Sequence, residues 1–125
     1  MYNVEFYETE NGKSELWDFL EELRLKSDKN KDARIQYKQL LFYIQLLSEN
    51  GTNLPENVTK HIDEDLWELR PGNNRVFYFF FKNNTYVLLH HFRKKTQKTP
   101  QREIEKAKSN RNNYISRMEN ENEKL

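Results

Sequence analysis

The densest group of chemically useful side chains in this 125-residue sequence is a histidine pair followed by a basic run. His90 and His91 stand directly before Arg93, Lys94 and Lys95, and residues 90–111 hold eight Lys or Arg against two Glu. Imidazoles exchange protons near neutral pH, and fixed lysine and arginine cations attract phosphate groups. An apolar stretch at residues 86–89 precedes the run, so its charges are expected to start anchored on a strand. This favours a phosphate-binding site; the alternative is a solvated surface run of lysines.

The adjacency of the two histidines bears on whether they bind a metal. Successive residues of a strand point to opposite faces, so His90 and His91 are not expected to share one ion. The sequence has no cysteine and only His61 as a further histidine, so it predicts no metal site. We expect one histidine to pack against a helix and the other to face outward, and for each a proton-transfer role and a structural role stay open. Strict alternation puts Tyr86, Leu88, His90, Phe92 and Lys94 on one face and Val87, Leu89, His91, Arg93 and Lys95 on the other.

Two arginines bracket the turn-forming residues 71–74 (PGNN). Pro, Gly and Asn are typical turn residues, so Arg70 ends one expected strand and Arg75 begins the next. If neighbouring strands pair in order, both arginines lie at the same end of the sheet as the basic run. The sequence therefore predicts one basic site built from both segments.

The overall charge conceals an asymmetry between the two halves of the chain. Residues 1–69 carry 8 basic and 15 acidic side chains, a net of −7, and residues 70–125 carry 13 and 5, a net of +8, which sum to +1. Such asymmetry indicates an electrostatically selected partner. No stretch is apolar enough to span a membrane, the first residues do not look like a secretory leader, and the absence of cysteine suits a reducing compartment. We expect a cytoplasmic protein that has no contact with membranes.

Hydrophobic periodicity predicts the elements of the first half. Residues 2–6 alternate as a strand, and Ser14 caps a helix whose apolar positions are spaced by three and four. Asp32 is the expected cap of a second helix that ends at Gly51. The short polar loop between the two helices predicts a helical hairpin.

The second half is predicted to be mostly strand. The expected strands are residues 58–62, a short edge strand, then 66–70, 75–82 and 85–92, of which 75–82 is apolar on both faces, as in a central strand. Thr99 as N-cap and Pro100 at the first position open a last helix. We expect one α+β domain over residues 1–125, with 119–125 as a frayed tail. Its expected order is β-α-α-β-β-β-α, a two-layer antiparallel sheet with the helical hairpin and the C-terminal helix packed on it.

Three stretches in this order carry a resemblance to a known family. They are DLWELRP at 65–71, RVFY at 75–78, and LLHHFRKKTQKTP at 88–100 followed by Glu103, Ile104 and Ala107. Together they resemble the RelE/HigB superfamily of bacterial toxins, in particular its phage-derived HigB-like branch. The likeness covers most of the chain in element order and residues 65–107 in detail, and it implies the RelE-like fold.

The resemblance implies a toxin of a type II toxin–antitoxin system that cleaves messenger RNA on the ribosome without metal or other cofactor. In such enzymes the RNA 2′-hydroxyl attacks the adjacent phosphate, and positive charge stabilises the transition state. By motif position, Arg70, Arg75, Lys94 and Lys95 would stabilise the phosphate and His90 or His91 would transfer protons. Four further cations would hold RNA or ribosome phosphates: Arg93, Lys98, Arg102 and Lys106. Where RelE-type enzymes often carry a functional Tyr or His near the C-terminus, this chain has Tyr114 inside a predicted helix, where it looks structural, so lysines are the alternative proton carriers.

The same resemblance implies the partners. They are a cognate helix-turn-helix antitoxin (HigA-like) in a heterotetramer, the ribosome with its mRNA, and operator DNA only through the antitoxin. Two other functions remain open. One is a non-catalytic, phage-derived module that binds nucleic acid or protein with the same fold. The other is an interaction domain whose acidic half docks a basic partner.

Overall fold

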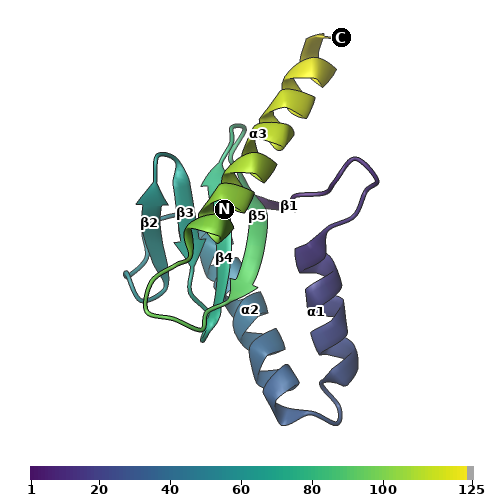
Figure 1. The fold of residues 1–125 in the computed structure, drawn as a ribbon, viewed down its shortest axis with the longest axis vertical. Helices are drawn as coiled ribbons and strands as arrows, with labels where there is room; N and C mark the ends of the chain where they lie inside the picture. Colours follow the sequence, from purple (N-terminus) through teal and green to yellow (C-terminus); the bar gives the residue numbers. More distant parts are fainter. Residues whose placement is uncertain (124–125) are drawn as a thin grey trace.

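The computed structural model describes residues 1–123 of the chain, and the side chains of residues 1–121. A strand, a helical hairpin, four further strands and a long C-terminal helix follow one another (Figure 1). Their bounds are β1 Asn3–Phe6, α1 Glu15–Lys26, α2 Lys31–Asn50, β2 Thr59–Asp63, β3 Leu66–Leu69, β4 Asn74–Phe80, β5 Thr85–Arg93 and α3 Gln101–Glu123. The α+β class and the RelE-like arrangement are confirmed. Strand β2 is the short edge strand expected at residues 58–62, so four strands follow the hairpin, one more than the expected order counted.

The five strands form one sheet in the order β1-β5-β4-β3-β2. Strands β2 to β5 pair antiparallel through short turns, as expected. Strand β1 differs, because it pairs parallel with β5, with Val4 opposite Tyr86. The sheet is therefore mixed, since the helical hairpin carries the chain away from β1 before the other strands begin.

Helices cover both faces of the sheet, so the expectation of two layers was wrong. The α1–α2 hairpin packs on one face, where Leu40 and Leu47 of α2 lie in one cluster with Tyr78 and Leu88 of the sheet. Helix α3 packs on the other face through Ile104, Ala107, Tyr114, Ile115 and Met118. Strand β4 lies between the layers and is buried at every position from Asn74 to Phe79, as predicted for a central strand.

The helix ends test the predicted capping residues. Ser14 caps α1, and its hydroxyl accepts the Trp17 N–H at 3.2 Å. Asn30, not Asp32, caps α2, because the Asn30 side chain accepts the Ala33 N–H at 2.9 Å. Gly51 ends α2 with a φ of 60°, a value that favours glycine.

The last helix begins one residue later than predicted and runs further. It starts at Gln101, with the Pro100 carbonyl accepting N–H groups of the first turn, and Thr99 turns its hydroxyl elsewhere. It continues to Glu123, through most of the expected frayed tail, and residues 124 and 125 lie outside the described residues. None of the described helices has the length and apolar character needed to cross a membrane.

Candidate phosphate-binding site

The β3–β4 turn and the end of β5 meet at one edge of the sheet. The Lys94 N–H donates to the Asn73 carbonyl at 2.7 Å, which fixes the start of the basic run beside the turn. Register across β4 and β5 pairs Arg75 with Phe92. The predicted proximity of the turn arginines and the basic run is therefore present.

A buried carboxylate joins the two arginines. Glu68 is 1% exposed, and its Oε1 lies 3.3 Å from Arg70 Nε and 3.7 Å from Arg75 Nε. Its Oε2 accepts the Thr99 hydroxyl at 3.3 Å, which ties the segment before α3 to the same group. Burial raises the pKa of the Glu68 carboxyl, although Arg75 and Arg70 oppose that shift. We call Glu68, Arg70 and Arg75 the arginine cluster.

Arg75 is held in place by several contacts and still reaches the surface. Its Nη1 donates to the carbonyls of Gly72 and Asn74, each at 2.8 Å. Burial lowers the pKa of Arg75, with Glu68 opposing the shift, and the group remains a cation. Its Nε is buried and has no hydrogen-bond partner among the described residues, and the residue lines an open hollow, where a ligand can reach it.

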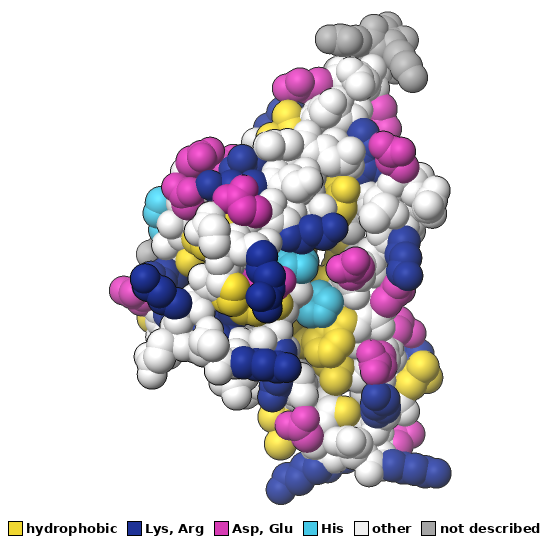
Figure 2. Space-filling view, in the orientation of Figure 1, with side chains coloured by type: hydrophobic (Ala, Val, Ile, Leu, Met, Phe, Trp, Pro, Cys, Tyr) yellow, Lys and Arg dark blue, Asp and Glu magenta, His cyan; other side chains and the backbone are white. Residues whose placement is uncertain are grey.

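The cations surround an open hollow at this edge of the sheet. We call it the basic hollow; its lining residues are Asn73, Arg75, Lys94, Lys95, Thr96 and Gln97. A second hollow beside it shares Lys95 and Thr96 and adds Arg93 and Arg102. Figure 2 shows several Lys and Arg side chains on this face, around two patches of histidine side chain. Fixed cations around an open hollow suit a phosphate group, whose charge they stabilise.

A β-bulge in β5 changes the predicted faces. Phe77 pairs with His90 but Tyr78 pairs with Leu88, so Leu89 is an extra residue in the strand. Tyr86 and Leu88 face the helical hairpin, whereas Val87 and Leu89 face α3. The extra residue shifts the alternation, so His90 and Phe92 follow on the α3 face and His91 on the hairpin side. Strand β5 ends at Arg93, so the alternation does not extend to Lys94 and Lys95, which line one hollow together. The prediction that His90 shares a face with Tyr86 and Leu88 was therefore wrong.

His90 lies on the same face as the arginine cluster but is closed in. Its Nε2 is 3.2 Å from Glu103 Oε1 on α3, and its side chain is 10% exposed. The ring stacks near Phe77, which also stacks on Phe92. His90 therefore lies behind an aromatic layer and does not line the basic hollow.

His91 lies on the opposite face. Its ring stacks on Phe19 of α1, with centroids 4.6 Å apart, and its Nδ1 is buried without a hydrogen-bond partner. Burial lowers the pKa of His91, and the neighbouring His90 adds to this shift. Each histidine thus packs against a helix, contrary to the expectation that one faces outward, and only His90 is on the face of the arginines.

The four predicted phosphate-holding residues are spread over the same end of the molecule. Arg93, Lys98, Arg102 and Lys106 are all exposed. Lys106 also lines a small cavity that reaches His90. Two other cations of the run are neutralised: Lys108 Nζ lies 2.5 Å from Asp63 Oδ2, and Arg111 Nη1 lies 2.6 Å from Asp65 Oδ1. These pairs remove Lys108 and Arg111 from the site.

Tyr114 occupies a packed position. It is 6% exposed, and its hydroxyl donates to Glu5 Oε2 at 2.6 Å, which links α3 to β1. Burial, with the hydrogen bond to Glu5, raises the pKa of the Tyr114 phenol. Within the described residues, no three His, Asp or Glu side chains lie close enough to hold a metal ion.

Sequence analysis missed two residues of this site. Glu68 stood within a quoted motif, but its alternating place in β3 did not reveal that its carboxylate would be buried between arginines. Thr99 looked like a helix cap, because Thr before Pro is a typical helix start. Only the pairing of β3 with β4 brings Glu68 to both arginines.

The fold and the site together define a small α+β domain that presents a fixed basic site at one edge of its sheet. Residues 18–112 match the family described as "Phage derived protein Gp49-like (DUF891)". The chain belongs to this family, which is associated with RelE-like toxins. Among curated protein sequences, none matches the chain significantly.

Proposed function

We propose that this chain is the toxin of a type II toxin–antitoxin system, close to the HigB branch, and that it cleaves mRNA on the ribosome in the cytoplasm. The observation that carries the proposal is the arginine cluster beside the basic hollow. Its buried carboxylate pairs with both arginines, and Arg75 lines the hollow together with Lys94 and Lys95. Membership of a family associated with RelE-like toxins supports the same class and an antitoxin as partner.

The proposed reaction is internal transesterification of RNA. The 2′-oxygen forms a bond to the adjacent phosphorus, and the bond from phosphorus to the 5′-oxygen breaks. The products are a 2′,3′-cyclic phosphate and a free 5′-hydroxyl. Negative charge grows on the phosphate oxygens on the way to the transition state, and Arg75, Lys94 and Lys95, which line the hollow, would stabilise it.

The reaction also requires that one proton leave the 2′-hydroxyl and another reach the 5′-oxygen. We assign these transfers to Lys94 and Lys95, because both line the basic hollow. One lysine, as the ammonium, donates to the leaving 5′-oxygen, and the other, as the neutral amine, accepts from the 2′-hydroxyl. His90 is closed in by Glu103 and Phe77, and His91 lies across the sheet, so neither is assigned a transfer.

The exposed cations around the hollow bind the flanking phosphates in this proposal. Arg93, Lys98, Arg102 and Lys106 lie at the same end of the molecule as the hollow. Phosphate contacts position a nucleic acid without reading its bases. They would hold mRNA or ribosomal RNA while the cluster acts on one linkage.

The test is cleavage of an mRNA bound to purified ribosomes, with analysis of the ends produced. The wild-type chain should give 2′,3′-cyclic phosphate and 5′-hydroxyl ends. Arg75→Ala should lower the cleavage rate by about 10²–10³, the loss typical of removing one transition-state donor. Arg24→Ala is the matched control: Arg24 is exposed on α1, where it pairs with Glu21, and its loss should leave the rate unchanged. Absence of cleavage by the folded wild type would leave the binding module as the function.

A further inference from the structure

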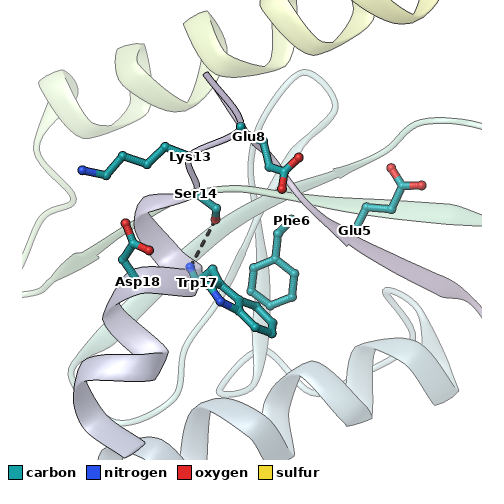
Figure 3. A pocket seen from close by; sticks show the side chains of 8 residues that line it. Glu5, Phe6, Glu8, Lys13, Ser14, Trp17 and Asp18 are labelled. Atoms are coloured by element: carbon teal, nitrogen blue, oxygen red, sulfur yellow. Dashed lines mark hydrogen bonds between the residues drawn. The ribbon is translucent and has the colours of Figure 1, made fainter. Parts of the chain in front are cut away.

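We propose that a groove between β1 and the start of α1 docks an extended, basic segment of a partner protein, which adds a strand to the open edge of the sheet. We call it the acidic groove; its lining residues are Glu5, Phe6, Glu8, Gly12, Lys13, Ser14, Trp17 and Asp18 (Figure 3). Its volume is about 770 Å³, within the ~300–1,000 Å³ typical of ligand-binding clefts. The inference does not depend on RNA cleavage.

An exposed aromatic pair forms the floor of the groove. Trp17 is 53% exposed, and its ring meets that of Phe6 edge to face at a centroid distance of 5.5 Å. Figure 3 shows the two rings side by side, with Lys13 extended away from them. A half-exposed tryptophan beside a cleft is the kind of residue that anchors a protein interface, since burying it removes a large apolar surface from water.

The backbone beside the groove is a strand edge that no other strand of the described residues covers. At its start the Tyr2 N–H donates to the Ser48 carbonyl of α2 at 2.7 Å, so the uncovered part begins after Tyr2. Strand β1 is the last strand of the sheet, and β5 is its only strand neighbour among the described residues. Asn3 and Tyr7 donate their N–H groups toward β5, to the carbonyls of Asn84 and Leu88, each at 2.8 Å. Alternate residues of a strand direct their N–H groups to opposite edges, so Val4 and Phe6 present theirs outward. Such an edge accepts an added strand.

The charge of the groove selects the partner. Glu8 and Asp18 line it against the single cation Lys13, and Glu15 is exposed on the neighbouring turn of α1. The third lining carboxylate, Glu5, accepts a hydrogen bond from the Tyr114 hydroxyl through one of its two oxygens. This acidic rim repels RNA and favours a segment with Lys or Arg beside an apolar anchor. The occupant that matches the rim, the aromatic floor and the open edge is therefore a basic, extended polypeptide.

Selection of a displayed library of short random peptides against the whole protein tests this inference. The enriched peptides should carry net positive charge and at least one large apolar residue. Binding of the best peptide should weaken about 30-fold in Trp17→Ala, the loss typical of an aromatic anchor. Asp18→Lys should also weaken it. Leu25→Ala is the control, because Leu25 is an exposed apolar residue on the same helix and lies outside the groove.

Hydrogen exchange read by NMR then separates strand addition from other modes of binding. The Val4 and Phe6 amides should become protected when the peptide is bound, with those of Asn3 and Tyr7 unchanged. Circular dichroism checks that Trp17→Ala folds. Failure of the library to enrich basic peptides, equal binding by Trp17→Ala, a helical bound peptide without Val4 and Phe6 protection, or self-association of the chain through this face would each overturn the inference.

Discussion

The basic hollow and the acidic groove are built by opposite means on one small domain. In the hollow, Arg75 is 8% exposed and is held by an ion pair with Glu68 and hydrogen bonds to two carbonyls. In the groove, Trp17 is 53% exposed and the β1 edge is unpaired. Phosphate chemistry needs charges that are fixed before the substrate arrives, whereas docking a chain needs surface and backbone that are still free.

The family match covers the basic hollow but only one residue of the acidic groove. Residues 18–112 contain the whole lining of the basic hollow, but of the groove they contain only Asp18. The hollow thus lies within the part of the chain that the family defines. The groove belongs almost wholly to the N-terminal strand and turn, which lie outside the matched residues.

The largest expected effect distinguishes the lysines from the histidine as proton carriers. Lys94→Gln should lower the rate of mRNA cleavage by about 10²–10⁴, the usual range for losing a general acid or base. His90→Gln should stay within about tenfold of wild type, because His90 does not line the hollow and its role is to pack against Glu103. Single-turnover cleavage on ribosomes measures both. If His90→Gln lowered the cleavage rate more than Lys94→Gln did, the proton transfers would be assigned to the His90–Glu103 pair and not to the hollow.

The next prediction concerns the carboxylate that no pattern singled out. Glu68→Gln should lower the cleavage rate by about 100-fold, because it releases Arg70 and Arg75 from a fixed position and small misplacements are costly. The loss should appear in the rate at saturating ribosomes rather than in their binding, which a purely structural role would not predict.

A stability measurement and a control variant test whether the loss in Glu68→Gln comes from the misplaced arginines. Thermal melting separates lost position from lost fold. Glu56→Gln is the control carboxylate, since Glu56 pairs with Lys60 at an exposed site. Binding of a groove peptide should be unchanged in Glu68→Gln, and a parallel loss of peptide binding would mean that the two regions are not independent.

The site shows why local patterns predicted its cations but not its geometry. Composition and turn chemistry were sufficient to place Arg70 and Arg75 beside the basic run, since antiparallel neighbours joined by short turns share their ends. The faces of His90 and His91 depended on the bulge at Leu89, which one extra residue creates and no alternation reveals.

The features of the fold that the sequence predicted depend on local contacts, and the features that it missed depend on distant ones. The Ser14 cap and the Gly51 end are local, and the sequence predicted both. The parallel pairing of β1 with β5 joins segments more than 80 residues apart, and the Lys108–Asp63 pair joins α3 to the β2–β3 turn. Long-range pairings of this kind have no short-range pattern, so the sequence predicted neither.

A smaller effect is expected from the exposed cations. Lys98→Ala, Arg102→Ala and Lys106→Ala should each weaken binding of single-stranded RNA a few-fold and reduce the salt slope of log K by ~0.7, the value for one phosphate contact. A fluorescent RNA titrated over a range of salt concentrations measures this.

Lys108→Ala is the matched control for the exposed cations. Lys108 lies on the same helix but pairs with Asp63, so its removal should leave the slope unchanged. If Lys108→Ala changed the salt slope as much as the other variants do, the ion pair with Asp63 would not prevent Lys108 from binding RNA. The boundary of the basic region would then extend along α3.

The smallest expected effect is a change of folding stability with pH that depends on His91. This residue packs against α1, between the two regions. Its pKa is below the ordinary 6.5 because burial disfavours the charged ring. The unfolded chain therefore binds a proton more readily, and this contribution to stability is complete above about pH 6.5 and is lost as the pH falls through the folded-state pKa. Chemical denaturation at a series of pH values should show this loss in the wild type and a flatter profile in His91→Gln.

Phe19, on which His91 stacks, is on the same helix as Trp17, so the pH series also tests how far the groove depends on the sheet beneath it. If the groove is carried by β1 and the first turn of α1 alone, peptide binding should stay constant over the pH interval in which global stability declines. A peptide affinity that falls together with the protonation of His91, and no longer does so in His91→Gln, would show that the hairpin face couples the two regions. The contrast between a fixed site and a free edge would then hold for their geometry but not for their energetics.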